Sequence, residues 1–134
     1  MATPMAESQK TILIIDDQPF FVTMQQNMLK QQGYRVLGAT SGPEGLVQAK
    51  QHRPDLILLD IEMPGMDGFA VCEKLKQDEE LRRIPVIILT ATQDAKLNEK
   101  AFRAGAEITI PKSVAGERLI NMLRIALEKS RPMA

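Results

Sequence analysis

The feature that most constrains the fold is a short apolar run that ends in a carboxylate, within residues 54–68. Residues 56–59 are all apolar, Asp60 follows them directly, and a Pro-Gly turn comes next. Such a run between chain breakers is typical of a strand buried on both faces, as strands of parallel sheets are. Ligand sites in open parallel sheets lie beyond the carboxyl ends of the strands, so Asp60 is predicted to lie there. The alternative is that Asp60 only ends a strand and begins a turn.

Short apolar runs alternate with helical patterns along the whole chain. The predicted strands are residues 11–15, 35–39, 56–59, 85–89 and 107–110. The predicted helices are residues 19–32, 41–51, 68–77, 96–104 and 114–129. This alternation implies a parallel sheet with helices on both faces and right-handed connections. We therefore predict an α/β fold: a doubly wound, flavodoxin-like parallel sheet of five strands in the order 2-1-3-4-5, with five helices.

The length and the charge of the chain limit the kinds of protein that it can be. Its 134 residues suit one domain, and we expect a disordered N-terminal tail over 1–9, a folded domain over 10–130 and a C-terminal tail over 131–134. The 17 basic and 17 acidic residues balance, which argues against direct nucleic-acid binding. No apolar run approaches the roughly 20 residues that cross a membrane, and no secretory signal begins the chain. With Cys72 as the single cysteine, the prediction is a cytoplasmic protein without contact to a membrane.

Polar side chains follow the other predicted strands as well. Asp16 and Asp17 follow the first strand, Thr90 ends the fourth and Lys112 follows the fifth. In the predicted order the first, third and fourth strands are neighbours, so these groups are expected to converge with Asp60 at one edge. Taken singly, each has an ordinary interpretation, such as a helix cap, a strand end or a surface lysine.

Close carboxylates repel one another, and a divalent cation removes that cost. An oxygen-only ligand set suits Mg²⁺, which binds through one or two carboxylates together with waters and phosphate oxygens. A carboxylate can also accept a phosphoryl group, and phosphoryl transfer depends mainly on positioning and on charge stabilisation. The sequence therefore predicts a magnesium-dependent phosphoryl site.

At this point the chain resembles the receiver domains of two-component response regulators, over about residues 10 to 129. The segments that carry the resemblance are Ile15-Asp16-Asp17-Gln18-Pro19, Leu58 to Gly68, Ile87-Ile88-Leu89-Thr90-Ala91, and Ala104-Gly105-Ala106 followed by Lys112. The resemblance implies that residues 10–130 form a receiver domain, a phosphoacceptor signalling domain that assists its own phosphorylation and dephosphorylation rather than an enzyme.

The resemblance also assigns roles at the site. It implies that Asp60 is the phosphoacceptor, that Asp17 binds Mg²⁺ directly and Asp16 through water, and that the backbone carbonyl of Glu62 is a further metal ligand. Thr90 would donate a hydrogen bond to the phosphoryl group, and Lys112 would pair with it. The donor would be a phosphohistidine on a sensor histidine kinase or a phosphotransfer protein.

A phosphoryl group adds nearly two negative charges, which gives the domain a switch. Thr90 would move toward it and shift the surface formed by the fourth helix, fifth strand and fifth helix, which would control a downstream target protein or output domain. The last helix has a predicted core face of Leu119, Ile120, Leu123 and Leu127, with Met122, Ile125 and Ala126 partly beside it. We expect a dimer or target interface there; the alternative is a wider buried face.

The chain departs from the family pattern near the fifth strand. Thr109 stands where the family usually has an aromatic residue, and Ser113 follows Lys112 where the family usually has a proline. A cis bond before a residue other than proline would cost about 2.5–4 kcal/mol, so we expect either a trans bond with a rearranged loop or a strained bond. Pro111 is tolerable at the end of an edge strand. Glu62 is hypothesised to pair with Lys112 or to affect water attack on the acyl phosphate; the alternative is a solvated side chain.

Two other functions are weighed against the switch. One is a degenerate receiver that serves as a constitutive protein-interaction module, which the altered residues around Lys112 favour and the intact acidic set opposes. The other is a flavodoxin-like cofactor-binding or phosphatase enzyme, which the absence of a glycine-rich phosphate loop opposes.

Overall fold

The computed structural model describes residues 9–91, 94–114 and 116–129. Its strands are β1 (Thr11–Ile15), β2 (Arg35–Ala39), β3 (Leu56–Asp60), β4 (Val86–Thr90) and β5 (Ile108–Pro111). Its helices are α2 (Pro19–Gln31), α3 (Gly42–His52), α4 (Gly68–Gln77), α5 (Ala95–Ala104), the short 3₁₀ helix η1 (Lys112–Val114) and α6 (Glu117–Lys129). Apart from Gln9, the two predicted tails lie outside the described residues.

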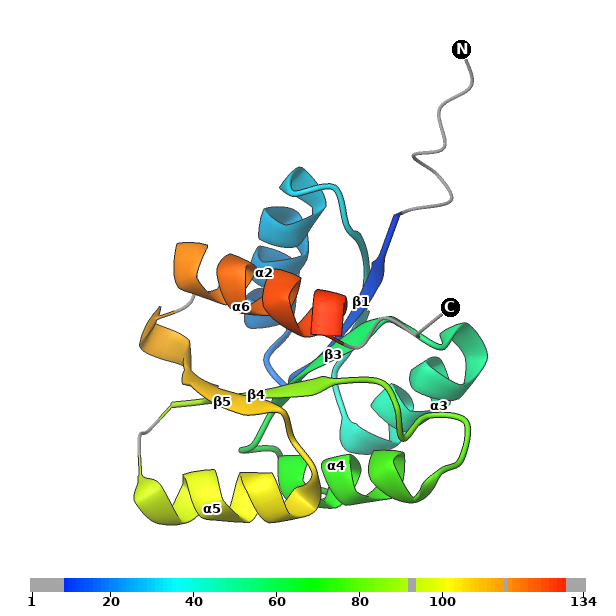
Figure 1. Ribbon diagram of the computed structural model, residues 1–134, viewed down its shortest axis with the longest axis vertical. Helices are drawn as coiled ribbons and strands as arrows, with labels where there is room; N and C mark the ends of the chain where they lie inside the picture. The colour runs from blue at the N-terminus through cyan, green and yellow to red at the C-terminus, as the bar shows by residue number, and fades with distance from the viewer. Residues whose placement is uncertain (1–8, 92–93, 115, 130–134) are drawn as a thin grey trace.

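The strands form one parallel sheet in the order β2-β1-β3-β4-β5, as predicted. In Figure 1, α2 and α6 cover one face of this sheet and α3, α4 and α5 cover the other. Every residue of β3 and of β4 is buried. The prediction of a doubly wound sheet is therefore confirmed, and the carboxyl ends of β1, β3 and β4 meet at one edge.

Alternate residues of the strands supply two separate cores. Leu58 of β3 packs in the same cluster as Leu29 of α2 and Leu123 of α6. The next residue, Leu59, belongs to the cluster that contains Val71 of α4. Because side chains alternate between the faces of a strand, continuous apolar runs are required wherever helices cover both faces.

The face that α2 buries could not be read from its most hydrophobic residues. Val22 and Leu29 are buried, whereas Phe20 is 79% exposed and Met24 is also exposed. Pro19 occupies the start of the helix, where its fixed φ and missing N–H cost little. The outcome is a helix that presents an aromatic side chain to solvent next to the edge where the strands end.

The chain between β5 and the last helix differs from the prediction. Pro111 closes β5 opposite Thr90, at the outer strand of the sheet, where a missing backbone donor is tolerated as expected. Residues 112–114 then form a 3₁₀ turn, and α6 begins at Glu117 rather than at residue 114. Gly116, directly before α6, has φ +108°. This left-handed conformation is not helical, so the helix begins only after it.

Among the described residues no helix is long and apolar enough to cross a membrane. In α6 the buried residues are Leu119, Leu123 and Leu127, while Ile120 is only partly buried against the core. Ile125 is 50% exposed. The core face of this helix is therefore close to the predicted one, with an apolar residue left in solvent.

Candidate functional site

Three carboxylates meet where β1 and β3 end. Asp16, Asp17 and Asp60 each offer an oxygen, and these oxygens lie within 4.8 Å of one another. Asp16 is 1% exposed and Asp60 is 3% exposed, whereas Asp17 is partly exposed. We call these three residues the acidic cluster. Their convergence from separate strands is the arrangement that the sequence predicted.

Backbone hydrogen bonds fix the β1 side of the acidic cluster. The amide of Asp16 donates to the carbonyl of Ala39 at 3.0 Å, which extends the β1–β2 pairing by one residue. Oδ1 of Asp16 accepts a hydrogen bond from the amide of Gln18 at 2.9 Å, and Pro19 then opens α2. The side chain of Asp16 is thus held in the turn between strand and helix, with Oδ2 left to face the site.

A close backbone approach fixes the β3 side. The amide of Ile61 donates to the carbonyl of Leu89 at 3.3 Å, and the amide of Gly68 donates to the carbonyl of Ile61 at 2.9 Å. A Cβ atom on Gly68 would collide with the carbonyl oxygen of Asp60 and lie 2.7 Å from Cα of Ile61. Glycine is therefore required at the first residue of α4 for the loop after Asp60 to fold back in this way.

Among the described residues, Lys112 is the one basic residue that forms ion pairs with the acidic cluster. Its Nζ lies 2.9 Å from Oδ2 of Asp16 and 3.2 Å from Oδ1 of Asp60, and its side chain is 18% exposed. Apart from this ammonium group, those two buried oxygens have no hydrogen-bond partner within the part of the chain that the structure describes. The ammonium group is thus their neutralising partner. On a further side, Nζ lies 4.4 Å from the centroid of the Phe21 ring.

Phe21 was not identified from the sequence. The available signal was its place in the first turn of α2, directly after the chain leaves the acidic cluster. Hydrophobic spacing did not distinguish Phe21 from the adjacent Phe20, because the two side chains are identical. In the structure it is Phe20 that is exposed to solvent.

The charges within the cluster alter the pKa of two groups. Burial, followed by the neighbouring charge of Asp16, raises the pKa of Asp60, and although Lys112 opposes both effects, the net result is a pKa of about 6. Burial lowers the pKa of Lys112, but hydrogen bonding to Asp16 and the charge of Asp60 outweigh it, so the pKa of the ammonium group is raised. The cluster is therefore short of positive charge, and a cation would relieve it.

The donor atoms fit Mg²⁺. All three side chains offer carboxylate oxygens, which is the ligand chemistry that a hard divalent cation prefers. Two of these oxygens are buried and share the single ammonium group of Lys112 as their described partner, so a second positive charge would lower the cost of burying them. The residues present therefore match a magnesium site of the kind the sequence predicted.

Thr90 and Glu62 flank the acidic cluster differently. Thr90 is buried at the end of β4, one residue beyond Leu89, which is the partner of Asp60 in the sheet. The side chain of Glu62 is exposed, and no ion pair joins it to Lys112 among the described residues, so the hypothesised Glu62–Lys112 pair is wrong for this structure.

The residues at which the chain departs from the family pattern are accommodated locally. None of the described peptide bonds is cis, so the bond from Lys112 to Ser113 is trans and continues into the 3₁₀ turn. Thr109 pairs with Ile88 across the sheet. The outcome matches the first of the two alternatives predicted for this loop, a trans bond with a rearranged backbone.

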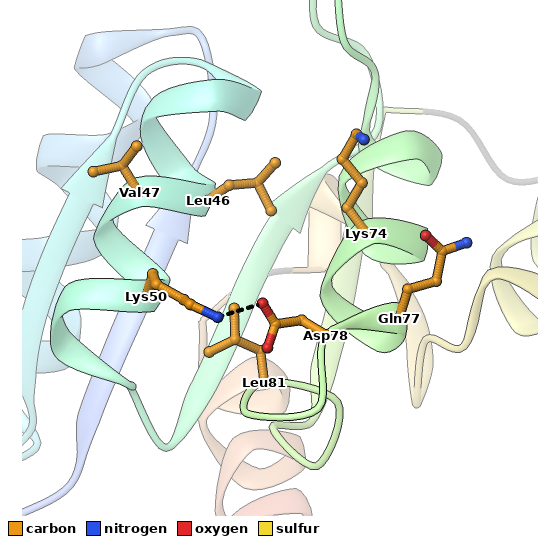
Figure 2. A pocket seen from close by; sticks show the side chains of 7 residues that line it. All are labelled: Leu46, Val47, Lys50, Lys74, Gln77, Asp78 and Leu81. Atoms are coloured by element: carbon orange, nitrogen blue, oxygen red, sulfur yellow. Dashed lines mark hydrogen bonds and ion pairs between the residues drawn. The ribbon is translucent and has the colours of Figure 1, made fainter.

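A pocket separate from the acidic cluster lies between α3 and α4, and Figure 2 shows Lys50 reaching across it toward Asp78. The Nζ of Lys50 lies 2.7 Å from Oδ2 of Asp78. The residues that line it are Leu46, Val47, Lys50, Lys74, Gln77, Asp78 and Leu81. It contains none of the three clustered metal-ligating carboxylates found among the described residues, so the acidic cluster is the better candidate site.

Comparison with known proteins identifies the family. Residues 12–124 match the response regulator receiver domain. The chain belongs to this family. The polar-differentiation response regulator DivK of Brucella ovis is 36% identical over 115 residues, which span 86% of this chain and 94% of DivK. This receiver is thus the phosphorelay signalling domain of a two-component response regulator and not a catalytic enzyme in its own right.

Solved structures of receivers have the same fold. The CheY-like receiver domain protein of Methanospirillum hungatei superposes with a TM-score of 0.85 at 28% identity, covering 92% of this chain and 97% of that one. The receiver domain of a signal transduction histidine kinase from Syntrophus aciditrophicus gives a TM-score of 0.85 at 32% identity, covering 93% and 95%. The acidic cluster and Lys112 therefore occupy a receiver framework.

Proposed function

We propose that this receiver accepts a phosphoryl group on Asp60. The Asp60 carboxylate is almost fully buried, lies beside the carboxylates of Asp16 and Asp17, and contacts an ammonium group. This combination is the observation that supports the proposal. Asp16 is less suited to this role because its Oδ1 already accepts a backbone hydrogen bond. The transfer forms a bond between an Asp60 oxygen and phosphorus and breaks the bond from phosphorus to the nitrogen of a donor phosphohistidine.

The neighbouring residues would each have one task. Asp16, Asp17 and Asp60, with the backbone carbonyl of Glu62, would hold Mg²⁺. When bound, Mg²⁺ neutralises charge on the phosphoryl oxygens. Lys112 would turn from the carboxylates to the new phosphoryl group, since its ammonium group already lies 3.2 Å from Oδ1 of Asp60. Thr90 would donate a hydrogen bond to the same group.

The partners follow from membership of the family. Membership of the family implies a histidine kinase as a partner, and we propose a sensor histidine kinase or a phosphotransfer protein as the phosphoryl donor to this receiver. We further propose residues 10–130 as the receiver unit, in the cytoplasm, with a target protein or output domain that contacts the α5–β5–α6 surface. Ile125 of α6 and Phe102 of α5 expose apolar side chains there, which supports this surface and a homodimer through it.

The side chain of Glu62 retains one proposed role, separate from that of its backbone carbonyl. With its side chain in solvent rather than on Lys112, it could act only on water that approaches the acyl phosphate. An unchanged lifetime of the phosphoryl group in Glu62→Ala would reject that role.

Labelling by acetyl phosphate tests the proposed function. With Mg²⁺ the protein should gain one phosphoryl group per chain, detected by mass spectrometry, and with EDTA it should gain none. Asp60→Asn should abolish the gain. Asp67→Asn is the matched control, because Asp67 caps α4 through Oδ1 at 2.9 Å from the amide of Ala70, and asparagine caps helices equally well. No labelling of the folded native protein would instead favour a constitutive interaction module.

A further inference from the structure

The ammonium group of Lys112 is held from three sides in this structure. Two sides are the carboxylates of Asp16 and Asp60, at 2.9 and 3.2 Å. The third is the face of the Phe21 ring, with Nζ 4.4 Å from its centroid. This distance is within the roughly 6 Å over which an aromatic face attracts a cation. The ring therefore belongs to the surroundings of a group that the proposed function requires.

The three contacts respond differently when a divalent cation is present. Carboxylates that bind a metal share their negative charge with it, so they attract a neighbouring ammonium group less strongly. The face of a phenyl ring is not a ligand for a hard cation, which takes oxygen donors. Of the three contacts, the one with Phe21 is thus the one that does not depend on whether the acidic cluster holds a metal.

The position of Phe21 suits this contact. It lies in the first turn of α2, whose start is fixed by Pro19 and by the bond from the Val22 amide to the Gln18 carbonyl at 3.1 Å. Its side chain is partly buried and packs against the core cluster under α2 and α6. The ring is therefore anchored at its base, while Lys112 comes from a short 3₁₀ turn at the far edge of the sheet.

We propose that Phe21 is a positioning residue for Lys112: its ring keeps the ammonium group beside Asp60 when a metal ion occupies the acidic cluster. The inference rests on the proposed function, and it adds a residue that acts through Lys112 rather than on the phosphoryl group. It also accounts for the contrast between two adjacent phenylalanines, of which Phe20 is exposed and Phe21 is turned to the lysine.

Nuclear magnetic resonance tests the contact without phosphorylation. Protons above an aromatic ring are shifted upfield, so the ε-methylene protons of Lys112 should resonate upfield of those of exposed lysines, both without metal and with Mg²⁺. Phe21→Leu should remove this shift and Phe21→Tyr should retain it. Phe20→Leu is the matched control, one residue away on the same helix and 79% exposed, and it should leave the shift unchanged.

The rate of labelling by acetyl phosphate at saturating Mg²⁺ tests the role. Phe21→Leu should slow labelling about three- to tenfold, the effect expected from losing one cation–π contact. Phe21→Tyr should restore the rate, and Phe20→Leu should not reduce it.

An unshifted Lys112 in the unsubstituted protein with Mg²⁺, a normal rate in Phe21→Leu, or a folded Phe21→Tyr that stays slow would each overturn the inference. If Phe21→Leu does not fold, two measurements decide whether the inference holds: the upfield shift of Lys112 in the unsubstituted protein, and the labelling rate of Phe21→Tyr. A native protein that shows the shift but takes no label would overturn the proposed function and leave the contact established.

Discussion

At the scale of single residues, the acidic cluster sets function against stability. Asp60 is buried beside Asp16, and one ammonium group serves both carboxylates. Burial, with help from the neighbouring charge, raises the pKa of Asp60 from 3.8 to about 6. At neutral pH the metal-free protein therefore contains a carboxylate whose charged form is less favourable when folded than when unfolded.

Asp60→Asn should stabilise the metal-free protein, and the gain should depend on pH. The folded-state pKa lies above the unfolded one, so the folded protein binds more protons between pH 3.8 and about 6. Its free energy of unfolding then falls as pH rises through this window. Urea unfolding in EDTA should show a gain of about 1–3 kcal/mol for Asp60→Asn at pH 7.5 that is absent at pH 3.5.

Asp67→Asn controls for the general effect of removing a carboxylate, because its side chain is an exposed helix cap outside the acidic cluster. A gain for Asp60→Asn that is the same at both pH values would contradict the proposed electrostatic cost. Saturating Mg²⁺ should shrink the gain, because a ligand that binds only the native protein stabilises it.

At the scale of elements, the site depends on the short connections that follow the strands. After β3 the chain turns back so closely that α4 starts against the backbone of Asp60 and Ile61. After β5 the chain takes one 3₁₀ turn, which carries Lys112 over the edge of the sheet to the acidic cluster. Short connections at the carboxyl ends thus determine the geometry that the sheet alone leaves open.

Gly68→Ala should distort the loop after Asp60. The new Cβ would meet the backbone of Asp60 and Ile61, which cannot move aside. The expected loss is about 1–3 kcal/mol in the free energy of unfolding, together with slower labelling by acetyl phosphate. Both can be followed in one preparation, by urea unfolding and by mass spectrometry.

Gly42→Ala is a matched comparison, since Gly42 is the first residue of α3 as Gly68 is of α4. Its new Cβ would meet side-chain atoms of Val71 and Met66, and neither of these residues belongs to the acidic cluster. The substitution should therefore leave the labelling rate unchanged, even where it lowers the stability. An equal effect of the two substitutions on labelling would argue that the close approach at Asp60 is unimportant for the site.

The regular elements were predictable from the sequence because their signals are local. The run at residues 56–59 is apolar throughout, and each of the predicted helices has Pro or Gly near at least one of its ends. The start of the last helix was not predictable, since the 3₁₀ turn at residues 112–114 and the left-handed Gly116 precede a helix that begins three residues later than expected. The contact of Phe21 with Lys112 joins positions far apart in the chain, and no local pattern encodes it.

At the scale of the whole molecule, the sheet has two covered faces and one chemically active edge. The α2–α6 face and the α3–α4–α5 face are filled by separate cores, and Figure 1 shows these two groups of helices on opposite sides of the sheet. Ile125 on α6 and Val47 on α3 are 50% and 57% exposed. These two residues allow the proposed homodimer surface to be compared with the opposite side of the molecule.

Beryllofluoride, which mimics the phosphoryl group, should shift the protein from monomer to dimer in sedimentation velocity experiments with Mg²⁺. Ile125→Asp should prevent this shift, because it places a charge in the proposed α5–β5–α6 interface. Val47→Asp, an equally exposed change on α3, should not. A protein that remains monomeric with and without beryllofluoride would exclude the homodimer.

The order of the strands also has a consequence for the chain as it is synthesised. β1 and β3 are neighbours, and the residues that supply the three carboxylates have all been made once the chain reaches Asp60. Their counter-charge, Lys112, is made 52 positions later, at the outer strand. Until then the growing polypeptide contains the three carboxylates without the amine, and any early pairing of β1 with β3 would bring like charges together. A cellular cation would serve as a temporary substitute, assisting folding before it serves in signalling.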